Sequence, residues 1–289
     1  MAYKIAYLKS KFMTARTTAC EFQDFAKSQG VDFALENFDF ESVKTDDLKK
    51  ISTCDAVVLS SAFCANSDAV ESLARHLNLY AKCVTKFAKT DNLIGKNVIL
   101  VSDVQADDSG EFRARAEFGR EAVHSLHISE LEIERTARIA YEIAETRTRR
   151  LVLSDANAPA NASKLWRKIV SDINEDYPLV HLEFEGLFDT TRKASTTPDA
   201  YDVILTPSAH FDAISGTLDA HNGLGSGTAT ICYLGETNVG AYGTERPSVF
   251  SPLFDFIALE KMLEHSFDLP ALAVAWRDKV QNMLQNLRD

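Results

Sequence analysis

The stretch from residue 151 to residue 178 constrains the fold more than any other part of the sequence. It opens on a short apolar run of strand type, residues 151–153, and continues into a loop that ends at Pro159. Apolar residues then recur at helical spacing, with Asn161 as the predicted N-cap. Pro178 marks the point where the chain leaves this helix. A strand that leads directly into an amphipathic helix is typical of α/β proteins.

The same alternation of strands and helices runs through the rest of the chain. Apolar runs predict strands at residues 4–8, 32–40, 54–61, 97–101, 180–184 and 201–206. Helical periodicity predicts helices at residues 17–28, 69–85, 129–144, 161–175, 253–265 and 269–287. The helix at 129–144 carries the clearest start signal, because Ser129 and Glu132 have the spacing of a capping box.

Length and composition restrict the function classes. A chain of 289 residues fits one doubly wound domain with a second lobe, or two modest domains. The net charge of −11 argues against a nucleic-acid-binding or anionic-membrane-binding surface, so neither partner is expected. The five cysteines are odd in number and include no Cys-x-x-Cys pair, which indicates reduced thiols. With no signal peptide and no apolar run of about 18 residues, a cytoplasmic protein is expected.

Several motifs resemble those of the isocitrate/isopropylmalate dehydrogenase family, the β-decarboxylating dehydrogenases. Asp155, the triplet Leu165-Trp166-Arg167 and the exit Asp176-Tyr177-Pro178 match the family with no gap. Residues 77–81, 134–142, 201–206 and 222–225 are also similar to family segments. The resemblance implies an α/β, two-lobe isopropylmalate-dehydrogenase-like fold with a central mixed sheet and a cleft between the lobes. Residues 1–97 and 236–289 would form the first, terminal lobe, and residues 98–235 the second, central lobe that mediates dimerisation.

The departures from the family's motifs fall at its functional positions. Ala156 stands where the resemblance places the catalytic lysine. Ala74 and Val84 replace two substrate-binding arginines, and the third arginine falls near Ser102. The catalytic tyrosine falls near Asp108. Since bidentate guanidinium pairing holds a dicarboxylate, the loss of these arginines removes the expected clamp.

Two neighbouring cations and two loops bear on whether the family's ligands still bind. Arg75 and Lys86 are close to the lost arginines in sequence and are predicted to be surface charges rather than substitutes. The loop at residues 9–16 contains no glycine, although a backbone that approaches a phosphate usually exploits glycine. Residues 238–243 carry neither the histidine nor the aspartate of the family's nucleotide loop. NAD(P) and Mg²⁺ or Mn²⁺ are the family's cofactors, but no cofactor-binding residue can be assigned from this sequence.

Asp212 and His210 are the candidate catalytic residues. In the family, two aspartates four residues apart bind a divalent metal; Asp212 matches the first and Gly216 replaces the second. The family's third carboxylate, given across the dimer, could be Asp189, although an ungapped register puts Phe188 there. Asp212 and Asp189 are therefore the predicted metal ligands. His210 with Asp212 could form a new acid–base unit.

Two functions follow from these residues. The first is a catalytically degenerate isocitrate/isopropylmalate-dehydrogenase-like protein with a binding, regulatory or structural role. The second is an NAD(P)-dependent oxidoreductase with altered active-site chemistry, acting on a 2-hydroxy acid or another small substrate. Either protein is expected to be a homodimer through the helix at 161–175 or the one after Pro207, with residues 111–127 adding to the contact. A small-molecule ligand could occupy the cleft.

Overall fold

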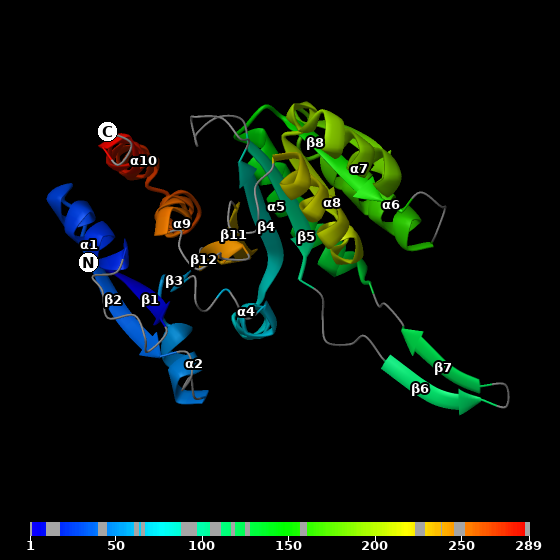
Figure 1. The fold of residues 1–289 in the computed structure, drawn as a ribbon, viewed down its shortest axis with the longest axis horizontal. Coiled ribbons are helices and arrows are strands. Elements are labelled where there is room, and N and C mark those ends of the chain that lie inside the picture. The colour runs from blue at the N-terminus through cyan, green and yellow to red at the C-terminus, as the bar shows by residue number, and fades with distance from the viewer. Residues whose placement is uncertain are drawn as a thin grey trace.

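The chain folds around one large mixed sheet (Figure 1). The computed structural model describes residues 2–9, 18–39, 45–60, 64, 67–87, 97–104, 111–116, 119–124, 128–156, 161–222, 229–237, 239–245 and 252–286. The strands of the large sheet are β1 (Tyr3–Lys9), β2 (Phe33–Asp39), β3 (Ala56–Leu59), β4 (Leu79–Phe87), β5 (Asn97–Asp103), β8 (Arg150–Asp155), β9 (His181–Gly186), β10 (Val203–Thr206), β11 (Ala229–Gly235) and β12 (Ala241–Glu245).

The order of the strands places the late part of the chain in the middle of the sheet. It runs β2-β1-β3-β12-β11-β4-β5-β10-β8-β9. Strand β11 is antiparallel to both β12 and β4, and β4 is antiparallel to β5. The remaining pairs are parallel. The α/β class with a central mixed sheet is therefore confirmed.

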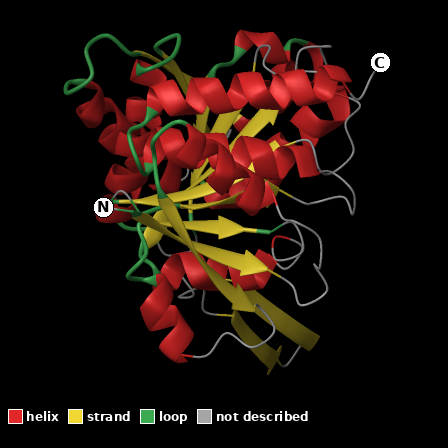
Figure 2. Cartoon of the chain, turned by 90° about the vertical axis from the view of Figure 1, so that its left-hand side faces the viewer, coloured by secondary structure: helices red, strands yellow, loops and turns green. Residues whose placement is uncertain are grey.

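Helices cover both faces of the sheet, and each face buries its own apolar core (Figure 2). One face packs against α1 (Thr18–Ser28), α5 (Glu130–Glu145), α6 (Asn161–Asn174), α9 (Pro252–His265) and α10 (Pro270–Asn286). The other packs against α2 (Thr45–Ile51), α4 (Ser67–His76), α7 (Leu187–Thr196) and α8 (Ser208–Asn222). A short 3₁₀ turn, η2 (Pro198–Ala200), leads into β10.

The two helices with the clearest sequence signals form as predicted. At the start of α5 the Ser129 side chain accepts a hydrogen bond from the backbone N–H of Glu132 at 3.3 Å. The Ser129 backbone N–H donates to Glu132 Oε2 at 2.8 Å, which completes the capping box. Helix α6 buries Trp166 and the aliphatic residues at helical spacing from it against the sheet. These caps and stripes fix how the two helices lie on β8.

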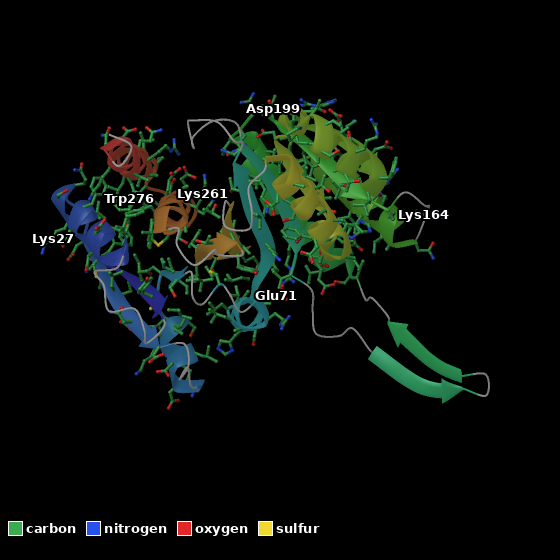
Figure 3. The ribbon with its side chains drawn as sticks, in the orientation of Figure 1. Lys27, Glu71, Lys164, Asp199, Lys261 and Trp276 are labelled. Carbon is green, nitrogen blue, oxygen red and sulfur yellow. The ribbon has the colours of Figure 1, made fainter. Side chains whose placement is uncertain are left out.

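Aromatic rings fill the core where α1, α9 and α10 meet. Trp276 is fully buried on α10, and its ring makes an edge-on contact with Phe22 of α1 at a centroid distance of 5.1 Å (Figure 3). Its indole N–H donates to the carbonyl of Phe256 on α9 at 2.8 Å. A buried indole N–H normally needs such a partner, so this bond allows the largest side chain to lie in the core.

One predicted helix is wrong in its second half. Residues 69–85 were expected to be one long helix, but α4 ends at His76 and β4 begins at Leu79. Asn78 lies between them with a φ of 55°, the left-handed conformation that asparagine tolerates at helix ends. Strand β4 is central and mostly buried on both faces, so its side chains show no clear polar–apolar alternation. The apolar residues of β4 therefore looked in sequence like a continuation of the helix.

The segment with little periodicity forms a hairpin. Strands β6 (Glu111–Ala116) and β7 (Gly119–His124) pair antiparallel as a separate two-stranded sheet. The hairpin projects from the body of the molecule (Figure 1). Within the described residues, this hairpin pairs only with itself and adds no strand to the large sheet.

The large sheet is continuous across the boundaries expected near residues 98 and 235. The division into a terminal and a central lobe stays a prediction. Within the described ranges, no helix combines the length and the apolar character needed to cross a membrane.

Candidate functional site

A small cavity lies at the carboxyl ends of β5 and β11, beside the first turns of α8. Its volume is about 140 Å³. The carboxyl end of β10, which runs parallel to β5, leads directly into α8. Such strand ends are where open α/β sheets bind ligands. The polar side chains of its wall come from four elements: Glu71, Lys82, Ser102, Asp103, Ser208 and Asp212.

Asp103 fixes the start of α8 in this cavity. Its Oδ1 accepts the backbone N–H of Ser208 at 2.8 Å, and its Oδ2 accepts the Ser208 hydroxyl at 2.9 Å. Burial raises the pKa of the Asp103 carboxyl even though these two hydrogen bonds favour the ionised form. Both carboxylate oxygens accept hydrogen bonds from Ser208 at the start of α8. Asp103 therefore positions the helix and is not an available metal ligand.

Lys82 is the cation of the cavity wall. Its Nζ lies 4.3 Å from the centroid of the Phe211 ring and 3.9 Å from Glu71 Oε1. Among the described lining residues, three carboxylates face this single ammonium group. A wall with this charge balance attracts a dianionic ligand less than a wall of arginines would.

The structure puts His210 and Asp212 on α8 in different surroundings. Asp212 is exposed and lines the cavity, whereas His210 is half-buried and is not among the described lining residues. Side chains two residues apart on a helix diverge by roughly 200°. Burial lowers the pKa of His210, partly offset by the charge of Asp155. Its Nδ1 is buried and finds no hydrogen-bond partner among the described residues. The acid–base pairing stays a prediction.

The two predicted metal ligands, Asp212 and Asp189, lie on different helices, α8 and α7. Asp189 is exposed on α7 and lies 3.4 Å from Arg192 of the same helix. No group of three or more histidine, cysteine or acidic side chains is arranged to hold a metal in the described part of the chain. Mg²⁺ and Mn²⁺ prefer several oxygen ligands, and one turn along α8 from Asp212 stands Gly216. These residues do not make a complete divalent-metal site within one chain. The metal role of Asp212 and Asp189 stays a prediction.

The positions matched to the family's charged residues are apolar or buried. Ala74 and Val84 are at most 1% exposed and belong to the core under α4. Ser102 is fully buried, with its hydroxyl 3.3 Å from the carbonyl of Asp103. Ala156 is half-buried just after β8. The position near Asp108 and most of the glycine-free loop lie outside the described residues, as do residues 223–225.

Lys86 was predicted to be a surface charge, and this is wrong. It lies near the end of β4 with its side chain 2% exposed, and its Nζ lies 2.8 and 3.0 Å from the two carboxylate oxygens of Asp219 on α8. Because β4 is a strand and not a helix, Lys86 points into the layer between sheet and helix. Arg75 is half-buried on α4. Asp219 was not identified from sequence, and no local pattern marks a partner 133 residues from Lys86.

Asp155 and Arg167 form the second strong ion pair of this region. Arg167 donates from Nε and a terminal nitrogen to the two oxygens of Asp155, at 2.6 and 2.8 Å. The Asp155 side chain is 1% exposed. This bidentate pair joins the end of β8 to α6, which gives the strand-to-helix motif of the sequence a structural role.

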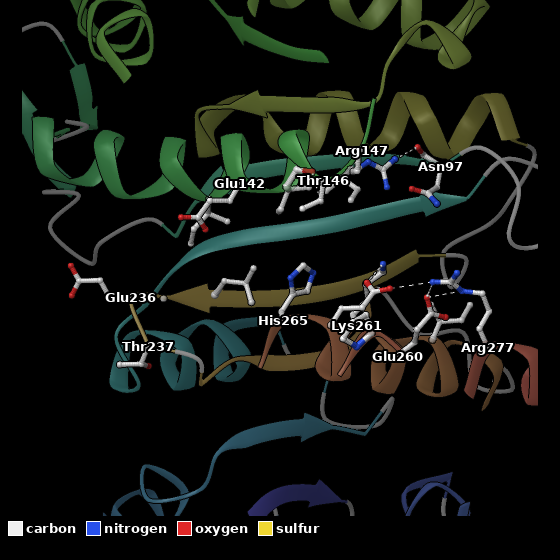
Figure 4. Close-up of a pocket in the computed structure, with 18 residues that line it drawn as sticks. Asn97, Glu142, Thr146, Arg147, Glu236, Thr237, Glu260, Lys261, His265 and Arg277 are labelled. Carbon is white, nitrogen blue, oxygen red and sulfur yellow. Dashed lines mark hydrogen bonds and ion pairs between the residues drawn. The ribbon is translucent and has the colours of Figure 1, made fainter. Parts of the chain in front are cut away.

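A larger cavity of about 830 Å³ lies on the other face of the sheet, between α5 and the pair α9 and α10 (Figure 4). Arg277 Nε donates to Glu260 Oε1 at 3.0 Å in its wall. Burial is the main cause that lowers the pKa of His265 there to about 4, with the charge of Lys261 acting in the same direction. None of the predicted catalytic or metal residues lines it, so the smaller cavity remains the candidate site.

Comparison with known sequences points to one family. The sequence model of the isocitrate/isopropylmalate dehydrogenase family matches residues 78–286, more than half of the chain. The 3-isopropylmalate dehydrogenase of Staphylococcus epidermidis is 33% identical over 155 residues, which are 50% of this chain and 44% of that protein. The corresponding enzyme of Campylobacter jejuni is 26% identical over 212 residues, 68% of this chain and 59% of that protein. The matched region thus spans about half the length of these relatives.

Solved structures agree on the fold. A β-decarboxylating dehydrogenase from Thermococcus kodakarensis superposes with a TM-score of 0.74 at 19% identity, covering 97% of this chain and 89% of that one. Isocitrate dehydrogenase from Methylococcus capsulatus gives a TM-score of 0.70 at 18% identity, covering 97% and 91%. From the sequence match and the shared fold, the chain belongs to the isocitrate/isopropylmalate dehydrogenase family.

Proposed function

We propose that this chain is a member of the family that has lost the standard oxidative decarboxylation and acts as a binding, regulatory or structural protein. The observation that carries the proposal is the set of residues at the family's functional positions. Five of them lack any ionisable side chain: Ala74, Val84, Ser102, Ala156 and Gly216. Three of the five are at most 1% exposed, so a substrate could not reach their side chains without rearrangement.

Neighbouring cations do not supply the lost charges. Lys86 is engaged by Asp219, and Arg167 is engaged by Asp155. Lys82 does face the small cavity, but Glu71 and two further carboxylates share that wall. Each charge-assisted hydrogen bond to a substrate carboxylate is worth roughly 1.5–3 kcal/mol. A dicarboxylate that loses three arginine clamps therefore binds too weakly for turnover at ordinary concentrations.

The groups that the reaction needs for proton transfer and metal binding are also missing. A divalent metal held at Asp212 would supply polarisation of a substrate's 2-hydroxyl group. Without a lysine at Ala156, this chain lacks a proton-transfer group typically worth 10²–10⁴ in rate. With Gly216 in place of the second aspartate, Asp212 alone would hold the ion from α8.

A second candidate function rests on His210. Its half-buried imidazole has a lowered pKa and a buried Nδ1 with no hydrogen-bond partner among the described residues. A neutral imidazole can act as a general base. The second candidate is therefore an NAD(P)-dependent oxidoreductase with altered chemistry, in which α8 would have to rearrange to bring His210 and Asp212 together as an acid–base unit.

Both functions are compatible with a cytoplasmic homodimer. We propose an interface formed by α6 or α8 together with the β6–β7 hairpin. The projection of that hairpin and the 64% exposure of Phe188 on α7 support a second chain packing on this side (Figure 1). Light scattering at micromolar concentration should give the mass of a dimer, and a monomer would contradict the interface.

The decisive experiment is a turnover assay with isocitrate, isopropylmalate, tartrate and malate. Each acid is tested with NAD⁺ and NADP⁺ in the presence of Mg²⁺ or Mn²⁺, and no reduced nucleotide should form. A thermal-shift screen of the same acids, nucleotides and metals then searches for a ligand, because a ligand that binds the native state raises its midpoint. Steady turnover that the substitution Asp212→Ala abolishes would establish the second function instead.

A further inference from the structure

Two cysteines face each other across the middle of the sheet. Cys83 of β4 is directly opposite Cys232 of β11 in the antiparallel ladder. Both are free thiols, and they are 2% and 6% exposed. A hydrogen bond with Cys232, together with burial, holds the pKa of the Cys83 thiol well above its usual range. The register of the two strands thus places the two thiols at directly opposed positions.

The backbone at this pair suits a covalent link. Directly opposed residues in an antiparallel ladder have Cα atoms about 4.5 or 5.5 Å apart, depending on the type of pair. A disulfide spans Cα separations of roughly 4.4–6.8 Å. Both side chains belong to the same buried cluster and thus point to the same face of the sheet. Neither strand has to shift its register for the two sulfurs to bond.

We propose that Cys83 and Cys232 form a redox site, in which a low-molecular-weight disulfide oxidises the two thiols to a cross-strand disulfide. The thiolate of one cysteine attacks the small disulfide and expels one thiolate, which leaves a mixed disulfide on the protein. The second cysteine then attacks the protein sulfur of that mixed disulfide and expels the other small thiolate. Two protein thiols lose two protons and two electrons, and one small disulfide becomes two thiols.

The larger cavity ends close to this pair, although neither cysteine is among its described lining residues. Leu234, two residues after Cys232 on β11, lines that cavity, and so does Ile99 of β5, the strand on the other side of β4. Both residues pack with the two cysteines on the same face of the sheet. Cys232 is the more exposed of the two, so it is the sulfur that attacks first and Cys83 is the one that resolves the mixed disulfide.

The cross-link would act on the strands that hold the sheet together. Strands β4 and β11 are adjacent in the middle of the sheet order, and the disulfide would close the loop from residue 83 to residue 232. A covalent link across so long a loop restricts the unfolded chain and raises stability. The oxidised protein should unfold several degrees above the reduced protein.

The test uses the full chain, incubated in glutathione buffers from fully reduced to fully oxidised. Free thiols are then alkylated under denaturing conditions, and the protein is digested without reductant for mass spectrometry. A cross-linked peptide pair containing Cys83 and Cys232, lighter by two hydrogens, should appear as the buffer becomes oxidising. Dithiothreitol should remove it. Exposed Cys20 reports whether the oxidant reacts at all, since it should form a mixed disulfide with glutathione.

Variants separate this site from general oxidation. Cys232→Ala should abolish both the cross-linked peptide and the redox dependence of the thermal midpoint. The matched control Cys54→Ala removes another buried thiol and should leave both intact. The peptide mapping on the unaltered chain decides the matter even if Cys232→Ala folds poorly. Complete alkylation of Cys83 and Cys232 in a buffer that has modified Cys20 would overturn the proposal, as would a pairing of either residue with Cys54 or Cys64.

Discussion

The buried ion pair between Lys86 and Asp219 predicts an unequal response to removing either partner. The Lys86 side chain is 2% exposed and the Asp219 side chain is 18% exposed. Asp219→Ala removes the carboxylate that pairs with a buried ammonium group, and breaking a buried pair in this way costs about 3–5 kcal/mol. Lys86→Met leaves a carboxylate that still reaches water and replaces the lysine stem with an apolar chain of similar length. We expect a cost of about 1–2 kcal/mol for this change.

The double variant is the sharpest part of this prediction. Lys86→Met combined with Asp219→Ala removes both charges, so its cost should be lower than that of Asp219→Ala alone. If lost packing alone set the cost, the second substitution would lower stability further. A double variant more stable than Asp219→Ala would therefore identify the unpaired charge as the cause. At about 2–4 °C for each kcal/mol, Asp219→Ala should lower the thermal midpoint by about 10 °C.

Urea unfolding at pH 7 measures these differences. Trp166 on α6 and Trp276 on α10 are both buried, so fluorescence reports on two separate parts of the core. The exposed pair Lys168–Asp172 on α6 is the control, and Asp172→Ala there should cost no more than about 0.5 kcal/mol. If Asp219→Ala costs no more than Lys86→Met, or if the double variant is the least stable, the reasoning from burial fails.

Three further predictions concern pH, metal binding and helix stability. The pKa of His265 is lowered to about 4, against 6.5 in the unfolded chain, so the unfolded state binds the proton first as pH falls. The free energy of unfolding should therefore drop by about 2 kcal/mol from pH 7 to pH 5. In urea titrations, His265→Gln should make that drop smaller. Lys261 and Glu264 are the charged groups that act on this histidine, and the pH window lies above the ordinary pKa of Glu264. Gly216→Asp places a second carboxylate one turn from Asp212, and nothing lies within 4 Å of a Cβ at that position. The variant should therefore show a Mn²⁺-dependent rise of the thermal midpoint that the unaltered chain lacks. An unshifted midpoint in Mn²⁺ would refute this prediction. Ser129→Ala removes the cap of α5 and should cost about 1 kcal/mol in the same urea assay, whereas no change would show that the capping box is dispensable.

Sequence reasoning predicted the elements whose signals are local. The capping box at Ser129, the strand and helix around residues 151–174 and the C-terminal helices formed as expected. It failed at β4, where a strand buried on both faces follows a helix and shows no clear alternation. The stop signal was Asn78, a residue that tolerates the left-handed conformation, and it could have been used.

The candidate site was less accessible to such reasoning because its contacts are long-range. Asp212 was identified through a motif, but the nearness of Lys82 to Glu71 and Phe211 depends on how β4, α4 and α8 pack. The burial of Lys86 depends on Asp219, and no periodicity records a partner so distant in sequence. Charges are predicted to be exposed on average, and a paired buried lysine is the exception.

The order of the strands has a consequence for how the protein is made. Strand β3 pairs with β12, and β4 pairs with β11, so both early strands receive these neighbours only from the last third of the chain. A ribosome that has not yet released residues 229–245 therefore holds two strands with open edges, and open edges recruit other chains. Strands β11 and β12 join the two halves of the sheet when they insert between β3 and β4. Chains truncated before residue 229 should therefore aggregate and not persist as a smaller folded unit.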